Sequence, residues 1–179
     1  MTEPLWTPSA ERIAASGLTR YAESLAERGI GPFASYADLH HWSVTERAAF
    51  WRSIWEFGGV LGDRGPRDVT SPDDAMPGTR FFPDGWLNFA ENLIERGRDS
   101  DVAIIATGEG VEDRVITRAE LRSRVDAVAG WLLDQGVKPG DRIAAVMPNL
   151  PETIIAALAT AKVGGIWSSC SPDFGMQGI

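Results

Sequence analysis

The chain has 179 residues, of which 44% are hydrophobic and 23% charged, so it has a globular composition and enough apolar material for one sizeable core or two small ones. Its 17 lysines and arginines stand against 25 aspartates and glutamates, and the net charge of −8 argues against binding to nucleic acid or to an anionic membrane surface. The single cysteine, Cys170, excludes an internal disulfide, and with neither a leader-like N-terminus nor a membrane-length apolar run we expect a soluble, cytoplasmic protein.

The first half of the chain is expected to be helical and rich in tryptophan, because five of the seven tryptophans lie there. Apolar residues recur at helical spacing between Ser9 and Gly29. A second helix is expected from Ser43, where the sequence SVTE matches a capping box between Ser43 and Glu46, to the glycine pair at Gly58 and Gly59. Tryptophans one turn apart in this helix are more typical of a core than of a cofactor site.

Residues 61–83 lose this periodicity and are rich in glycine and proline, which predicts a long irregular connection. A short helix is expected to begin at Asn88, with Glu91 as its capping partner, and to stop at Gly97. The helical, tryptophan-rich N-terminal extension is therefore expected to cover residues 1–98.

The second half is predicted to alternate between strands and helices. The expected strands are residues 102–106, 114–117, 142–147 and 165–170. A capping box at Thr117 and Glu120 should open a helix with one apolar face. Pro151 suits the first position of the next helix, which is apolar over most of its surface and is expected to be buried on both sides.

This alternation predicts an α/β fold with a parallel sheet and right-handed crossovers. Only about two crossovers are present, so the sheet would end on an exposed apolar strand, which natural domains avoid. We therefore expect residues 99–179 to be the incomplete start of a larger domain whose remainder covers the sheet.

Ligands of such sheets bind beyond the carboxyl ends of the strands, which here are followed by the segments PNLPE and SSCSPDFG. Neither segment is a glycine-rich phosphate-binding motif. His40 and His41 are adjacent, so they cannot share one face of a helix as metal ligands do in H-E-x-x-H motifs. The residues alone therefore indicate an α/β segment with no recognisable catalytic centre.

Several stretches resemble the N-terminal part of AMP-forming acyl-CoA synthetases of the adenylate-forming superfamily. They are the tryptophan-rich beginning, residues 84–97 (DGWLNFAENLIERG), and residues 116–175 with the phrases GVKPGDR, MPNLPE and GGIW. The phrase WSSCSPDFG is similar to the branch of this family that activates acetoacetate. The resemblance implies a ligase that uses acetoacetate and Mg²⁺-bound ATP to form an acyl-adenylate and pyrophosphate, after which the thiol of coenzyme A displaces AMP.

The resemblance places the phosphate loop, the adenine and ribose contacts and the catalytic lysine of the family beyond Ile179. We therefore expect no catalytic residue, no metal ligand and no tightly bound cofactor in this chain, and no activity from it alone. The turn of Ser171, Pro172 and Asp173 corresponds to one that lies against the nucleotide end of coenzyme A in acetyl-CoA synthetases, but it equally suits a helix start capped by Ser171. Trp167, on the preceding strand, either shapes the acyl pocket or packs the strand.

Two other functions remain open at this point. A synthetase for acetate, propionate or another short acid would carry the same superfamily motifs. A non-catalytic α/β interaction module would instead use the exposed edge of its sheet to bind a partner. In every case the expected ligands are small molecules or protein, with neither nucleic acid nor membrane as a partner.

Overall fold

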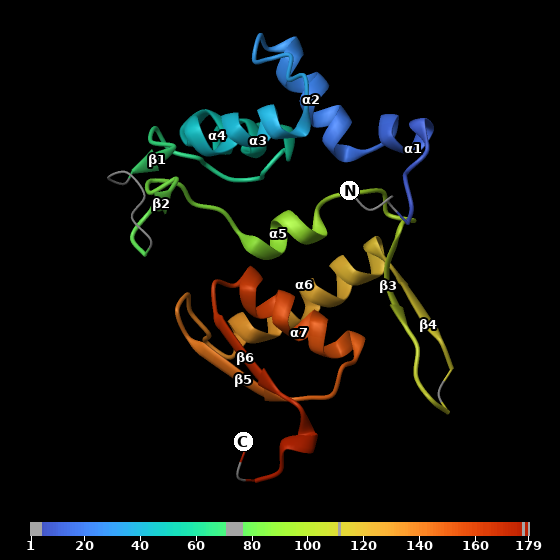
Figure 1. Cartoon of the computed structure of the whole chain (residues 1–179). Coiled ribbons are helices and arrows are strands. Elements are labelled where there is room, and N and C mark those ends of the chain that lie inside the picture. Colours follow the sequence, from blue (N-terminus) through green and yellow to red (C-terminus); the bar gives the residue numbers. More distant parts are fainter. Residues whose placement is uncertain (1–4, 71–76, 111, 177, 179) are drawn as a thin grey trace. The chain divides into compact units, whose positions relative to one another are not determined.

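The computed structural model describes residues 5–70, 77–110, 112–176 and 178, and the chain divides into two compact units, residues 1–86 and 87–179 (Figure 1). Helix α5 (Phe89–Ile94) belongs to the second unit, where it contacts the long helices of that unit. The predicted domain boundary between residues 98 and 99 lies further along the chain than this division, and it stays a prediction for the intact protein.

The first unit is built mainly from helices. They are α1 (Ala10–Ala14), α2 (Gly17–Glu27), α3 (Tyr36–Thr45) and α4 (Arg47–Phe57). The first three each begin after a serine, Ser9, Ser16 or Ser35, whose side chain accepts a hydrogen bond from the backbone N–H three residues on. The predicted helical region before Gly29 is thus confirmed, but it is interrupted where Ser16 starts α2.

The capping box predicted at Ser43 and Glu46 is wrong. Ser43 lies inside α3, and its hydroxyl donates a hydrogen bond to the carbonyl oxygen of His40 at 2.7 Å. A serine inside a helix can satisfy its hydroxyl on the preceding turn in this way, so the S-x-x-E spacing alone does not identify a helix start. Glu46 precedes α4 without a side-chain cap, whereas the predicted end of α4 at Gly58 is confirmed.

A small aromatic core holds the helices of this unit together. Its buried members are Tyr21, Leu25 and Leu39, on α2 and α3. The two tryptophans of α4 pack on the following segment, with ring centroids 5.1 Å apart for Trp51 and Phe81 and 4.9 Å apart for Trp55 and Phe82. The tryptophan stripe therefore contacts neighbouring aromatic rings, but Trp51 is 37% exposed and the stripe lies outside the buried core.

The connection predicted over residues 61–83 contains short regular pairing. Strands β1 (Val69–Thr70) and β2 (Arg80–Phe81) are antiparallel, and Asp63 pairs with Trp86 in both directions at 2.9 and 2.8 Å. Strands of two residues carry no period-two pattern, so sequence periodicity could not reveal them.

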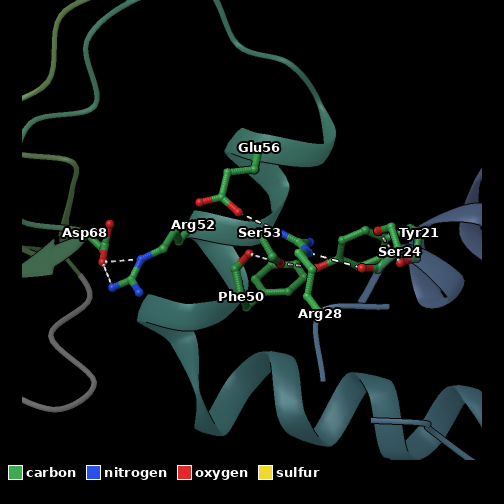
Figure 2. A network of polar contacts seen from close by, with 8 residues as sticks. All are labelled: Tyr21, Ser24, Arg28, Phe50, Arg52, Ser53, Glu56 and Asp68. Atoms are coloured by element: carbon green, nitrogen blue, oxygen red, sulfur yellow. Dashed lines mark hydrogen bonds and ion pairs between the residues drawn. The ribbon is translucent and has the colours of Figure 1, made fainter. Parts of the chain in front are cut away.

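A polar network joins α4 to α2 and to this connection (Figure 2). The hydroxyl groups of Tyr21 and Ser53 share a buried hydrogen bond of 2.6 Å, and burial raises the pKa of Tyr21. On the other side of α4, the buried carboxylate of Asp68 is held by Arg52, as Figure 2 shows, and also by Arg64. The pairing of Asp68 compensates for the cost of burying its charge.

The second unit contains a hairpin, two long helices and a parallel pair of strands (Figure 1). After α5, its elements are β3 (Val102–Ala106), β4 (Arg114–Thr117), α6 (Arg118–Asp134), β5 (Arg142–Val146), α7 (Pro151–Lys162), β6 (Ile166–Cys170) and the 3₁₀ turn η1 (Pro172–Phe174). The bounds of the four predicted strands are confirmed to within one residue. The capping box of Thr117 and Glu120 is also confirmed.

The strands of the second unit pair in two separate ways among the described residues. β5 and β6 are parallel from Arg142 opposite Ile166 to Val146 opposite Cys170, and α7 forms the crossover between them. β3 and β4 form an antiparallel hairpin of their own. The α/β class and the parallel pairing of β5 with β6 are confirmed, but β3 and β4 do not join that pair in the described residues. The short connection from β3 to β4 holds no crossover helix, so these two strands are antiparallel to each other.

Helices α6 and α7 provide most of the core of this unit. Val125 of α6 and Ile155 and Ala159 of α7 are buried in it. Ile154, the residue before Ile155 on α7, is 41% exposed, so the expected burial of α7 on both sides is wrong for the described residues. One face of this apolar helix stays open beside the β3–β4 hairpin.

Candidate functional site

The carboxyl ends of β5 and β6 lie at the same edge because the two strands are parallel. Residues 148–150 follow β5, and Ser171 follows β6. The backbone N–H of Met147 donates to the carbonyl oxygen of Cys170 at 3.1 Å, so the pairing continues to the last residue before each loop. The two segments that the sequence singles out, PNLPE and SSCSPDFG, therefore meet at this strand-end edge.

Ser171, Pro172 and Asp173 form a capped turn at this edge. The Ser171 hydroxyl accepts a hydrogen bond from the Asp173 N–H at 3.3 Å and donates one to the Asp173 carboxylate at 2.9 Å. Pro172 is the first residue of η1, and Gly175 ends the turn with a φ of 67° that favours glycine. The predicted capping role is confirmed, while a contact of these three residues with coenzyme A stays a prediction.

Trp167 lies on the same strand but away from this turn. It is half-buried, pairs with Ile143 of β5, and donates from its indole nitrogen to the Ser169 hydroxyl at 3.2 Å. It lies four positions before Ser171, which corresponds to about 13 Å along an extended strand. The structure therefore does not bring Trp167 together with the Ser171 turn, and its role in an acyl pocket stays a prediction.

A cavity of about 500 Å³ opens beside the strand-end edge. The hairpin lines it with Ile104, Ile105 and Thr107, and the start of α7 and the preceding loop line it with Asn149, Leu150 and Ile154. The sequence identified the PNLPE segment as part of a candidate site, but it did not identify the hairpin as the opposite wall. That contact joins residues more than forty positions apart, which no local pattern encodes.

Arg114, which lines this cavity, takes part in an ion pair. The Arg114 guanidinium, at the start of β4, donates to both carboxylate oxygens of Glu152 at 2.8 and 3.0 Å. These bonds, together with the backbone at the start of α7, lower the pKa of Glu152 to about 2 from its ordinary value of 4.5. Sequence reasoning missed this pair, although a carboxylate in the first turn of a helix is a familiar partner for the positive end of the helix dipole.

Other classes of site find no support in the described part of the chain. Among those residues, no group of three or more His, Cys, Asp or Glu side chains is placed to hold a metal ion. His40 instead stacks on the ring of Tyr36, with centroids 6.2 Å apart. None of the described helices combines the length and the apolar character needed to cross a membrane.

Comparison with known families gives two matches that follow one another along the chain. Residues 36–93 match the family described as acetyl-coenzyme A synthetase N-terminus, and residues 93–179 match the family described as AMP-binding enzyme. The candidate edge and the cavity both lie within the second match.

Individual relatives agree with these families. The chain is 46% identical to the acetoacetyl-coenzyme A synthetase of Rhizobium meliloti (strain 1021) over 98% of its own length and 27% of that protein. It is 35% identical to the acetoacetyl-CoA synthetase of Mus musculus over 98% of its length and 26% of that protein. The solved structure of acetoacetyl-CoA synthetase from Streptomyces lividans matches with a TM-score of 0.88 and 40% identity, over 98% of this chain and 28% of that one. The chain thus spans about a quarter of the length of these relatives.

Proposed function

Because the chain has the sequence and fold of the N-terminal part of an adenylate-forming enzyme, we propose that the intact protein is an AMP-forming ligase that joins acetoacetate to coenzyme A. The observation that carries this proposal is the 46% identity to an acetoacetyl-coenzyme A synthetase over 98% of the chain.

The proposed reaction has two steps. An oxygen of the acetoacetate carboxylate attacks the α-phosphorus of ATP, and pyrophosphate leaves. The sulfur of coenzyme A then attacks the acyl carbon, and AMP leaves with the electron pair of the broken C–O bond. Adenylation turns a poor acyl donor into a good one, and both steps need the reactants held together.

Within this reaction, the chain contributes binding surface and no reacting group. We propose that the turn from Ser171 to Asp173 contacts the ribose or adenine of coenzyme A, because the Asp173 carboxylate would repel the phosphates of the coenzyme. Magnesium would arrive with the phosphates of ATP. Trp167 would then support β6 by packing, with the acyl pocket as its alternative role.

The choice of acid is the finer part of this proposal. A relative named malonamoyl-CoA synthetase vrtB, from Penicillium aethiopicum, is 33% identical over 98% of the chain, so related enzymes differ in the acid that their names specify. The higher identity to acetoacetyl-coenzyme A synthetases favours acetoacetate over acetate, propionate or malonamate.

A substrate panel tests this choice. The purified intact protein is incubated with ATP, Mg²⁺ and coenzyme A, and AMP release is measured with acetoacetate, acetate, propionate or malonamate. We expect kcat/KM to be highest for acetoacetate by at least about tenfold, which corresponds to about 1.4 kcal/mol of transition-state binding. A preference for another acid would reassign the substrate, and no AMP release with any acid would favour the interaction module.

A further inference from the structure

We propose that Arg114 and Glu152 are positioning residues that hold the strand-end edge in place for coenzyme A. The inference rests on the proposed function, because it assumes that coenzyme A binds at the turn of Ser171 to Asp173. It adds two residues that lie outside β5 and β6. Both are connected to the carboxyl ends of these strands through other residues.

The pair controls the start of α7. Glu152 is the second residue of that helix, and Arg114 binds both of its carboxylate oxygens. A bidentate pair fixes the direction as well as the distance between two groups. The residue that precedes α7, Leu150, offers no side-chain cap, so the Arg114 guanidinium adds a restraint from the hairpin to the local bonds of the helix start.

The start of α7 is in turn connected to the candidate site through a chain of short contacts. The carbonyl oxygen of Pro148 accepts hydrogen bonds from the Thr153 hydroxyl at 2.7 Å and from the Leu150 N–H at 2.9 Å. The next residue back, Met147, donates to the carbonyl oxygen of Cys170, immediately before Ser171. A displacement of α7 would therefore be passed to the loop after β5 and to the turn after β6.

The cavity explains why this connection needs a restraint. It separates the hairpin from the loop after β5 and the start of α7, so side-chain packing does not fill the space between these walls. The ion pair bridges them at one side. Without it, the hairpin could move relative to α7 at little cost in buried apolar contacts.

The exposed fractions of the two side chains favour a positioning role over a purely stabilising one. The side chains of Arg114 and Glu152 are 46% and 45% exposed, and ion pairs this exposed contribute little to the free energy of unfolding. Removing either partner should therefore change the geometry of the edge more than the stability of the protein.

The test uses the intact protein with Arg114→Gln and Glu152→Gln. We expect each variant to raise KM for coenzyme A by about threefold to tenfold, since that range corresponds to a small loss of binding free energy, while kcat and the KM values for ATP and acetoacetate stay within about twofold. The double variant, Arg114→Gln with Glu152→Gln, should raise KM for coenzyme A no more than either single variant, because both substitutions remove the same ion pair.

A matched control is available in the first unit. Arg28 and Glu56 form an ion pair with side chains 34% and 49% exposed, and Arg28→Gln should leave all three KM values unchanged. Equal increases for coenzyme A, ATP and acetoacetate, no increase in either single variant, or an additive increase in the double variant would each overturn the inference. If the wild type itself makes no acetoacetyl-CoA, the proposed function has failed; if the wild type is active and the variants match it, only the positioning role has.

Discussion

Asn88 connects two helices with one amide side chain. Its oxygen accepts a hydrogen bond from the Glu91 N–H at 3.1 Å and so caps α5, while its nitrogen donates to the carbonyl oxygen of Lys162 at 2.9 Å, at the end of α7. The first bond was predictable from sequence, because it joins residues three apart. The second joins residues 74 apart and needed the structure.

The substitution Asn88→Asp separates these two bonds. The aspartate keeps the capping oxygen but replaces the donor with an oxygen that faces the Lys162 carbonyl, so we expect the free energy of unfolding to fall by about 1–3 kcal/mol. Urea unfolding followed by tryptophan fluorescence measures this. Asn149→Asp is the matched control at an exposed loop position and should change stability by less than about 0.5 kcal/mol. Equal effects would mean that the Lys162 bond contributes nothing.

Glu152 gives a prediction about pH. Its pKa is about 2 in the folded protein and 4.5 ordinarily, so the folded state favours the charged form. A lowered carboxyl pKa stabilises the protein at pH values above the ordinary pKa, and this contribution is lost as the pH falls from about 4.5 to about 2.

The stability difference between the wild type and Glu152→Gln should therefore be constant above about pH 5.5 and shrink steadily below pH 4.5. Because the pair is half exposed, the difference should also be small and should decrease at high salt. Unfolding curves of both proteins at several pH values test this. A difference that grows as the pH falls would contradict the assigned pKa direction.

At the scale of elements, Asp68 links the irregular connection of residues 61–83 to α4. Its carboxylate is buried and paired with Arg52 and Arg64, and its backbone carbonyl accepts from the Phe82 N–H at 2.7 Å. This one residue, which precedes β1, therefore contacts α4, Arg64 in the connection and the residue after β2. No periodic pattern marks it, because a buried carboxylate in an irregular segment is recognisable only from its partners.

The substitution Asp68→Asn should loosen this connection. Both arginines would lose their carboxylate partner, and we expect the free energy of unfolding to fall by about 2–4 kcal/mol, since removing one member of a buried pair is strongly destabilising. Asp84→Asn is the matched control, because Asp84 pairs with Arg67 at the surface and should cost less than about 1 kcal/mol. Limited proteolysis should cut residues 61–86 faster in Asp68→Asn only, and similar cutting of both variants would argue against a special role of the buried carboxylate.

Elements with local signals were predictable, and those that depend on distant partners were not. Pro151 at the first position of α7 and the capping box at Thr117 identified helix starts correctly, because each uses residues within one turn. Ser43 failed because Ser35 had already started the helix. The sequence also could not distinguish the β3–β4 hairpin from strands of a common sheet, since both have short apolar runs.

At the scale of the whole molecule, the strands leave apolar surface uncovered in the described residues. Ile105, Val115, Val146 and Ile166 are each about half exposed or more, on β3, β4, β5 and β6. The relatives that the chain matches are nearly four times as long. We propose that the remainder of the enzyme covers these strands.

The 179-residue chain on its own should therefore associate, because open strand edges and apolar faces favour pairing between copies. Size-exclusion chromatography with light scattering should give species larger than the 19.4 kDa monomer at high concentration. The intact protein should not show the same concentration dependence. A compact, monomeric chain at all concentrations would favour the interaction module over a part of a larger enzyme.

The central proposal is that this chain is the non-catalytic beginning of an acetoacetate-activating ligase. Acetoacetate-dependent ATP–pyrophosphate exchange tests it most directly, because this assay isolates the adenylation step and needs no coenzyme A. We expect exchange by the intact protein that depends on acetoacetate, and none by the 179-residue chain at the same concentration. Exchange by the chain alone, or an intact protein that is inactive with acetoacetate, would contradict the account.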